Sequence, residues 1–130
     1  LHLKSMWTER KDDPQAKIRR EKEARTMRDL IRKKYPPESK SEYLIVGDFN
    51  DHKDSPPLRR FTTVNDTVLS SMIPCFDSQG HLWTHYFKKQ DSYSRIDYIL
   101  ASNELKILSF NTIKKTFSDH YPIIATIGWD

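Results

Sequence analysis

Short apolar runs separated by polar turns dominate the second half of the chain. The clearest run covers residues 43–47, where β-branched residues precede a break at Gly47, and it predicts a buried strand. Other strand-like runs, which we expect to join it in one sheet, lie at residues 1–4, 82–87, 94–100, 107–116 and 121–127. Between them, residues 54–61 predict a loop or short helix. Residues 64–82 are ambiguous, with a possible short helix ahead of a turn at residues 78–80.

Residues 13–35 have the period of a long helix. Asp13 is suited to the N-cap and Pro14 to the first turn, and the prolines at 36 and 37 end the pattern. Ile18 falls opposite a narrow apolar stripe made by Ala16, Ala24, Met27, Leu30 and Ile31. One long helix ahead of several strands predicts an α/β layer architecture, with the helix covering the sheet and its charges turned outward.

Composition limits the size of the core. The chain has 130 residues, 36% of them hydrophobic and 31% charged, which predicts one domain or part of one, with a thin core or a missing partner surface. The strand-like start at Leu1 favours a fragment. No run is apolar enough to span a membrane, the single Cys75 excludes an intramolecular disulfide, and the cellular compartment stays open.

Positive charge is concentrated in residues 9–40, which hold twelve Lys or Arg and seven Asp or Glu, while the whole chain carries +4. Acids interleaved with bases favour a solvated helix face. The alternative is a non-catalytic basic module that binds nucleic acid through residues 9–40.

Two polar side chains follow the strand of residues 43–47. Asp48 and Asn50 lie two positions apart, a spacing at which side chains on an extended chain point the same way. The carboxylate can bind a hard cation or take a proton from water, and the amide can donate to a phosphate oxygen. A simple exit from strand to loop is the alternative, because Gly, Asp and Asn are common in turns.

Further polar groups lie at other strong strands. Asp97 interrupts the apolar run 94–100, where a carboxylate without a partner is costly; Arg95 on the same face could pair with it. Asp119 and His120 precede the Ile-rich run 121–127, and His2 stands in the opening run. Taken singly, Asp119 and His120 are more typical of a turn, and His2 is more typical of a surface histidine or a satisfied core histidine.

In chain order, these groups resemble the motifs of the endonuclease/exonuclease/phosphatase superfamily of DNase I-like enzymes, and most of all its small bacterial metal-dependent hydrolases. The resemblance covers residues 2–124 and implies about half of a two-sheet sandwich: one mainly antiparallel or mixed sheet with a long covering helix. The matching segments are His2-Leu3-Lys4-Ser5, Gly47-Asp48-Phe49-Asn50, Arg95-Ile96-Asp97-Tyr98 and Ser118-Asp119-His120.

The resemblance implies a metal-dependent phosphoester hydrolase, whether phosphodiesterase, nuclease or phosphatase. Asp48 would hold or deprotonate the attacking water, and Asn50 would hold a phosphate oxygen. His120 would stabilise the transition state or protonate the leaving oxygen, with Asp97 accepting a hydrogen bond from it. His2 would contact the phosphate.

The resemblance also implies a hard divalent ion, Mg²⁺ or Mn²⁺, because the candidates offer oxygens and no thiolates. Asp119 and Asp48 are the expected ligands, and Arg95, Trp83 and Tyr93 would shape the substrate side.

The family's N-terminal half supplies an Asn and the Glu that is its principal metal ligand, and no Glu in residues 9–42 lies in a strand context that could replace it. We therefore expect residues 1–130 to form a partial domain whose missing partner is that half. The piece alone should bind Mg²⁺ weakly, hydrolyse little and self-associate through the sheet face left uncovered. The phosphoester substrate, possibly nucleic acid, stays open.

Overall fold

The computed structural model describes residues 1–115 and 117–129, and combines one long helix with several short antiparallel ladders. The helices are α1 (Lys17–Lys34) and α2 (Pro56–Thr62), with 3₁₀ turns η1 (Pro14–Ala16), η2 (Pro37–Ser39) and η3 (Lys88–Gln90). The strands are β1 (Leu44–Asp48), β2 (Thr63–Val64), β3 (Thr67–Val68), β4 (Ser70–Met72), β5 (His85–Phe87), β6 (Ser92–Ser94), β7 (Asp97–Ser102), β8 (Lys106–Thr112) and β9 (Ile123–Gly128).

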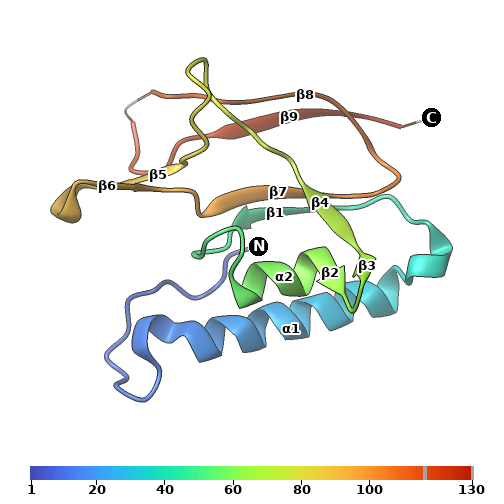
Figure 1. Cartoon of the computed structure of the whole chain (residues 1–130), viewed down its shortest axis with the longest axis horizontal. Coiled ribbons are helices and arrows are strands. Elements are labelled where there is room, and N and C mark those ends of the chain that lie inside the picture. Colours follow the sequence, from blue (N-terminus) through green and yellow to red (C-terminus); the bar gives the residue numbers. More distant parts are fainter. Residues whose placement is uncertain (116, 130) are drawn as a thin grey trace.

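The elements form layers. Helices α1 and α2 lie together below the β1–β7 pair, and the β8–β9 hairpin runs above it (Figure 1). The central sheet has the order β1-β7-β4, while β2–β3, β5–β6 and β8–β9 are separate two-stranded ladders. The mixed α/β class and the covering helix agree with the sequence prediction.

The prediction of one continuous sheet is wrong. The opening residues contribute a single parallel bridge between His2 and Asp48 instead of a strand. The ambiguous stretch 64–82 forms β3 and β4 instead of a short helix, whereas α2 and the turn at residues 78–80 lie where expected. The end of the run predicted at 107–116 lies outside the described residues. Short apolar runs fix strand character, but ladder partners depend on distant segments.

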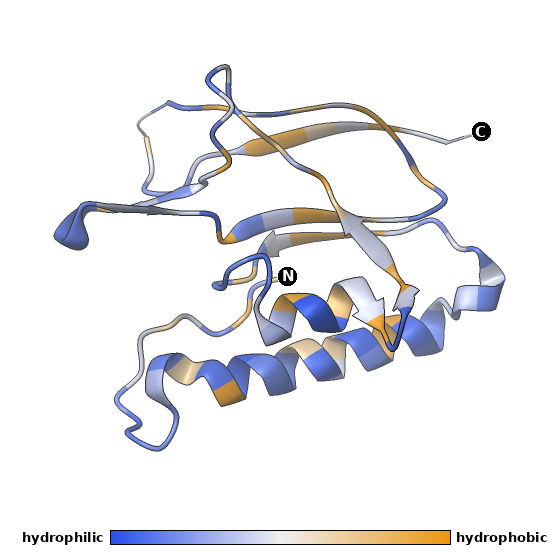
Figure 2. Cartoon of the chain, viewed as in Figure 1, coloured by the Kyte–Doolittle hydropathy of each residue, from blue (hydrophilic) through white to orange (hydrophobic). Residues whose placement is uncertain are grey.

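Two apolar clusters lie on opposite faces of the β1–β7 pair. The cluster on the helix side contains Leu3, Ala24, Ile45, Phe49, Leu58, Phe61, Tyr98 and Leu100. The cluster under β8 and β9 contains Ile73, Cys75, Ile99 and Ala101. Figure 2 shows the apolar stretches along β7 and β9, with a largely hydrophilic α1. A thin core divided between two faces therefore holds the layers together.

Helix α1 departs from the prediction in its capping and in the burial of two side chains, Leu30 and Arg20. The Asp13 carboxylate accepts hydrogen bonds from the backbone N–H groups of Ile18 and Arg19, at 2.8 and 3.0 Å, so it caps the helix across the intervening 3₁₀ turn. Leu30, expected on the apolar stripe, is 56% exposed. Arg20, expected among the outward charges, is fully buried.

Gly47 lets the opening segment approach β1. A Cβ at Gly47, whose φ is +144°, would lie 1.9 Å from the Leu1 carbonyl oxygen. The backbone there is occupied by hydrogen bonds from Asp48 N–H to Leu1 O (3.1 Å) and from Leu3 N–H to Asp48 O (3.0 Å). Glycine at this position therefore brings His2 beside Asp48.

Among the described residues, no helix is long and apolar enough to cross a membrane.

Candidate active site

The site starts from the strand register. Asp48, the last residue of β1, pairs with Asp97, the first residue of β7. Directly paired residues of antiparallel strands point to the same face, so both carboxylates project from one end of the sheet, on the face opposite the helices. This pairing of the two carboxylates depends on the register between the strands, which neither strand specifies alone.

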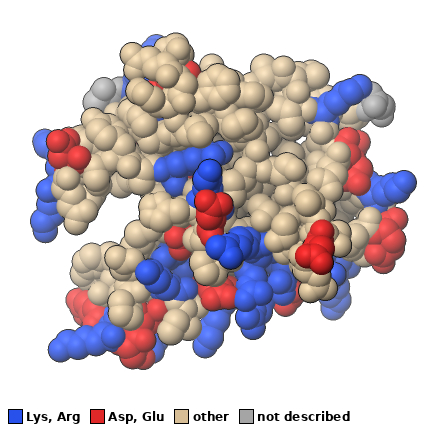
Figure 3. Space-filling view, in the orientation of Figure 1, with Lys and Arg blue, Asp and Glu red and all other residues tan. Residues whose placement is uncertain are grey.

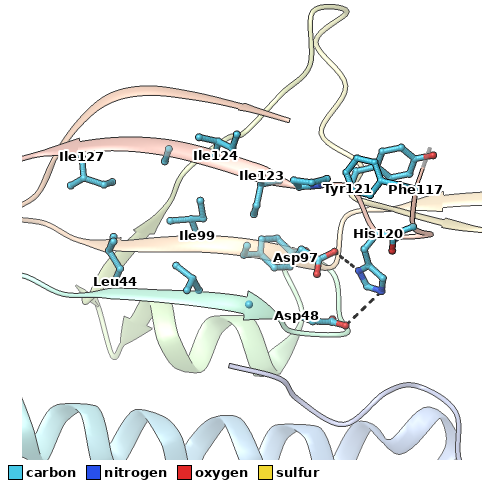
Figure 4. Close-up of a pocket in the computed structure, with 16 residues that line it drawn as sticks. Leu44, Asp48, Asp97, Ile99, Phe117, His120, Tyr121, Ile123, Ile124 and Ile127 are labelled. Carbon is cyan, nitrogen blue, oxygen red and sulfur yellow. Dashed lines mark hydrogen bonds and ion pairs between the residues drawn. The ribbon is translucent and has the colours of Figure 1, made fainter. Parts of the chain in front are cut away.

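His120 reaches these carboxylates from the segment before β9. Its Nδ1 lies 2.9 Å from Asp97 Oδ2, within the hydrogen-bond range expected from the sequence. Its Nε2 lies 3.9 Å from Asp48 Oδ2. Figure 4 shows the imidazole between the two acids. Asp97 therefore orients the ring, and Nε2 is left toward Asp48.

Thr84 fixes the Asp97 carboxylate. Its hydroxyl donates to Asp97 Oδ2 at 2.7 Å and accepts from the backbone N–H groups of Ile96 and Asp97 at 3.2 and 3.1 Å. Thr84 is buried, so the hydroxyl has no competition from bulk water. A buried donor on the carboxylate limits the orientations that Asp97 can offer to His120.

Asp48 and its neighbours form a tight turn. Asp48 Oδ1 accepts from the backbone N–H of Asn50 at 2.8 Å, which leaves Oδ2 toward the histidines. His2 Nε2 lies 3.7 Å from Oδ2, and the His2 side chain is 74% exposed. Asn50 has left the strand, with φ +51°, and its amide donates to Leu3 O at 2.8 Å. The expectation that Asp48 and Asn50 point the same way along a strand is therefore wrong, because the chain turns between them.

The acids and histidine shift one another's pKa. Burial lowers the pKa of His120, but the Asp97 hydrogen bond and the charges of Asp97, Asp48 and Asp119 outweigh it, so the pKa lies above its ordinary value. Burial is the largest cause that raises the pKa of Asp48; the Asn50 N–H opposes it and Asp97 adds to it. Both shifts favour the protonated forms of His120 and Asp48 relative to the free side chains.

An open groove leads from the site. It has a volume of about 720 Å³ and contains Asp48, Asp97 and His120 at one end. The remaining wall is largely apolar and comes from β1, β7, β9 and the segment directly before β9, with Leu44, Val46 and Ile124 each more than two-fifths exposed. Figure 4 shows Leu44, Ile99 and Ile123 facing the space between the strands.

Among residues 1–115 and 117–129, possible metal ligands fall into two groups that share His120. Asp48, Asp97 and His120 offer ligand atoms within 4.8 Å of one another, and so do His85, Asp119 and His120. The expected pair of ligands, Asp48 and Asp119, is divided between these groups. The Asp119 carboxylate is next to His85, with Oδ2 3.6 Å from Nε2.

The residues expected on the substrate side lie in two environments. Arg95 donates to Ile73 O at 3.1 Å and lies over the Tyr98 ring. The proposed Arg95–Asp97 pair is not what the structure contains, because β7 begins only at Asp97 and strand alternation does not extend back to Arg95. Trp83 and Tyr93 pack together with ring centroids 4.5 Å apart.

Sequence reasoning missed three contributors. Thr84 and His85 lie in a run that predicted only a strand, and their partners are distant in sequence. Arg20 was hidden in a basic helix; its Nε donates to Asp51 Oδ2 at 2.8 Å, which ties α1 to the loop after Asn50. The signal that could have found Arg20 was a basic residue on the side of the helix that faces the core.

Comparisons with known protein families and solved structures identify similar proteins. The Endonuclease/Exonuclease/phosphatase family matches residues 10–120. A crystal structure of the endonuclease/exonuclease/phosphatase from Bacteroides vulgatus is 20% identical with a TM-score of 0.65, over 85% of this chain and 45% of that one. A family protein from Bacteroides thetaiotaomicron is also 20% identical, with a TM-score of 0.60, over 85% of this chain and 46% of that one. No curated protein sequence gives a significant match.

This chain spans less than half the length of those two structures. The family match, in contrast, covers most of this chain and includes Asp48, Asp97 and His120. The chain therefore belongs to the endonuclease/exonuclease/phosphatase family.

Proposed function

We propose that this chain carries the acid–base residues of a metal-dependent phosphoester hydrolase. Membership of the family suggests this class of reaction. The observation that supports it most is the placing of His120 between Asp97, at 2.9 Å, and Asp48, at 3.9 Å, at one end of a groove.

The roles follow from the contacts. Asp48, with its raised pKa and one oxygen free of the turn, accepts a proton from the attacking water. The acidic neighbours of His120 raise its pKa, which favours the protonated ring, and His120 presents Nε2 to a phosphate oxygen or to the leaving group. Asp97 and Thr84 position His120. His2 contacts the phosphate from the exposed side.

The role proposed for Asn50 is limited to the second hydrogen of its side-chain amide. One of its amide hydrogens is already donated to Leu3 O, which leaves the second for a phosphate oxygen. This bond also fixes the amide beside the segment that carries His2, so the two groups would approach the substrate together.

The donor set fits a hard divalent cation in part. Asp48 and Asp119 offer carboxylate oxygens, and Mg²⁺ commonly uses one or two carboxylates with several waters. When bound, Mg²⁺ or Mn²⁺ would polarise the phosphate. The two carboxylates lie in different donor groups, so we propose that further ligands come from a remainder of the fold.

We propose that residues 1–130 form a partial domain and that the groove is covered by the rest of the fold. The chain spans 45% of the Bacteroides vulgatus structure, and the exposed Leu44, Val46 and Ile124 give the groove an apolar wall. An apolar face of this kind is typical of a surface that another layer covers.

A panel of phosphoesters with Mg²⁺ or Mn²⁺ tests the proposal. Phosphodiester, phosphomonoester and DNA substrates should be offered to the longest natural chain that contains these residues, and to the 130-residue chain. We expect hydrolysis by the former and little by the latter. Asp48→Asn and His120→Gln should each lower kcat by at least about 100-fold, the scale of general acid–base catalysis.

Asp66→Asn is the matched control, since Asp66 is an exposed carboxylate in the turn between β2 and β3. It should leave kcat unchanged. Unaltered hydrolysis in both site variants would refute the assignment of the site, and hydrolysis of no phosphoester would refute the function.

The alternative is a non-catalytic module that binds nucleic acid through the basic residues 9–40. Ion pairs within the chain argue against it. Several arginines of this segment pair with carboxylates, namely Arg10 with Asp12, Arg19 with Glu23, Arg20 with Asp51, Arg25 with Glu21 and Arg28 with Asp29. Figure 3 shows charges of both signs mixed over the helical side. Nucleic-acid binding by this segment stays a prediction.

A further inference from the structure

We propose that His85, Asp119 and His120 form a site for a borderline divalent transition-metal ion, for which Zn²⁺ is the probe. This donor set differs from one suited to Mg²⁺: two imidazoles and one carboxylate in place of oxygens alone. Imidazole nitrogen suits Zn²⁺, Cu²⁺ and Ni²⁺, whereas Mg²⁺ takes oxygen ligands.

The backbone holds the two histidines opposite each other. His85 and His120 form an isolated antiparallel bridge, flanked by hydrogen bonds from Tyr86 N–H to Asp119 O (2.9 Å) and from Tyr121 N–H to Thr84 O (2.7 Å). Since these bonds join the flanking residues, the histidines are a non-hydrogen-bonded pair, the arrangement in which side chains lie closest. Their ring centroids are 4.7 Å apart.

The third donor is already beside this pair. Asp119 Oδ2 lies 3.6 Å from His85 Nε2, and one ligand atom from each of the three residues lies within 4.8 Å of the others. Donors about 2.0–2.2 Å from one tetrahedral Zn²⁺ lie roughly 3.3 Å from each other. Small rotations of the side chains would bring the three donor atoms to this spacing, and the fourth coordination position would remain for water.

Asp97 prepares His120 for this role. Because Nδ1 is bound to Asp97 at 2.9 Å, Nε2 is the nitrogen that a metal would take. A carboxylate on the far nitrogen of a metal-binding histidine fixes the tautomer and raises the basicity of the ligand. Asp119 is 69% exposed and His120 37%, so an ion can enter from solvent.

A metal ion bound at this site would engage the His120 nitrogen that otherwise faces the groove. A bound ion takes the same Nε2 that lies 3.9 Å from Asp48. If the proposed hydrolase function holds, Zn²⁺ at this site inhibits the reaction while Mg²⁺ supports it. The binding site itself does not depend on that function.

Zn²⁺ titrated into the 130-residue chain in excess Mg²⁺ tests the site, with calorimetry for affinity and stoichiometry and NMR of the histidine rings for location. We expect one ion per chain, with shifts at His85 and His120. His85→Phe, which keeps an aromatic ring, should weaken the affinity by more than about 100-fold, and Asp97→Asn by about 10- to 100-fold. His52→Ala is the control, since His52 is exposed and outside the donor group; it should bind as the unaltered chain does.

Within the part of the chain that the structure describes, the rival sites are the second donor group of Asp48, Asp97 and His120 and the pairs of His2 with Asp48 and His81 with Asp77. Ring shifts at His2 or His81 in place of His85, or affinity unchanged in His85→Phe, would overturn the proposal. Circular dichroism verifies that each variant is folded. If His85→Phe does not fold, His85→Asn and the ring shifts of the unaltered chain decide the question.

Discussion

His120 occupies a position in which each ring nitrogen faces a carboxylate. Asp97 lies at 2.9 Å from Nδ1 and Asp48 at 3.9 Å from Nε2. These acids hold its pKa above the ordinary value although burial opposes them. The same contacts that would make His120 an acid toward phosphate therefore also couple its protonation to folding.

Asp97→Asn should lower the pKa of His120, because the amide keeps the shape and removes the charge. With the raised pKa, stability from His120 is fully present below its ordinary value of about 6.5 and is lost as pH rises through the higher folded value. NMR titration of the ring and urea unfolding across this range would measure both effects. The variant should lose most of this pH dependence, whereas Asp66→Asn should retain it; equal behaviour of the two variants would contradict the coupling.

The loop after β1 shows how elements position the site. Gly47 leaves space for the opening segment to pack against β1, and the Asp51 carboxylate forms an ion pair with the buried Arg20 of α1. Arg20 also donates to the carbonyls of Lys4 and Gln15, at 3.2 and 2.8 Å. One helix residue thus connects the segment bearing His2 with the loop that follows Asp48 and contains Asn50.

Gly47→Ala should destabilise the fold by about 3 kcal/mol or more, because the new Cβ adds a backbone clash to unfavourable φ. Gly80→Ala is the matched control: its φ is +80° and nothing lies within 4 Å of an added Cβ, so only strain of about 1 kcal/mol is expected. Urea unfolding measures the difference. Equal losses would mean that the opening segment does not pack on β1 in solution.

Arg20→Leu should cost about 3–5 kcal/mol, since it leaves the buried Asp51 carboxylate without its partner. Arg19→Leu is the control, because Arg19 pairs with Glu23 on the exposed surface of the same helix and such pairs contribute about 0–1 kcal/mol. The measurement is again urea unfolding. A small loss in Arg20→Leu would show that water reaches Asp51.

At the scale of the whole molecule, the thin core leaves one face of the β1–β7 pair incompletely covered. β8 and β9 pack over Ile99 and Ala101, while Leu44 and Val46 remain 44% and 47% exposed beside the groove. Removal of apolar surface from water contributes roughly 25 cal/mol per Å² of favourable free energy. In the absence of a remainder of the fold, a second copy offers the same apolar face.

The isolated chain should therefore self-associate through the groove, with more than about 1,000 Å² buried in total. Val46→Glu should shift it toward monomer in analytical ultracentrifugation at micromolar concentration. Val68→Glu is the control, because Val68 in β3 is similarly exposed, at 51%, but lies outside the groove. A monomeric unaltered chain, or equal effects of the two variants, would contradict this interface.

The sequence by itself determined the family, the presence of strands within the runs 43–47 and 94–100, the long helix and the candidate residues Asp48, Asp97 and His120. These are local properties: an apolar period, a proline stop, or a motif of adjacent residues is readable without knowing its partners. The split of the expected sheet into separate ladders was not readable in this way, because Met72 pairs with Leu100 across 28 positions.

Only the tertiary structure decided which groups meet. Thr84 reaches Asp97, Arg20 reaches Asp51, and His85 stands opposite His120, each across ten or more positions of chain. Burial was equally undecided, since Arg20 and Arg19 are neighbours in sequence and only one is enclosed. The physical reason is that contacts, desolvation and pKa depend on distances between segments, and a linear pattern specifies a segment's own conformation but not what is folded against it.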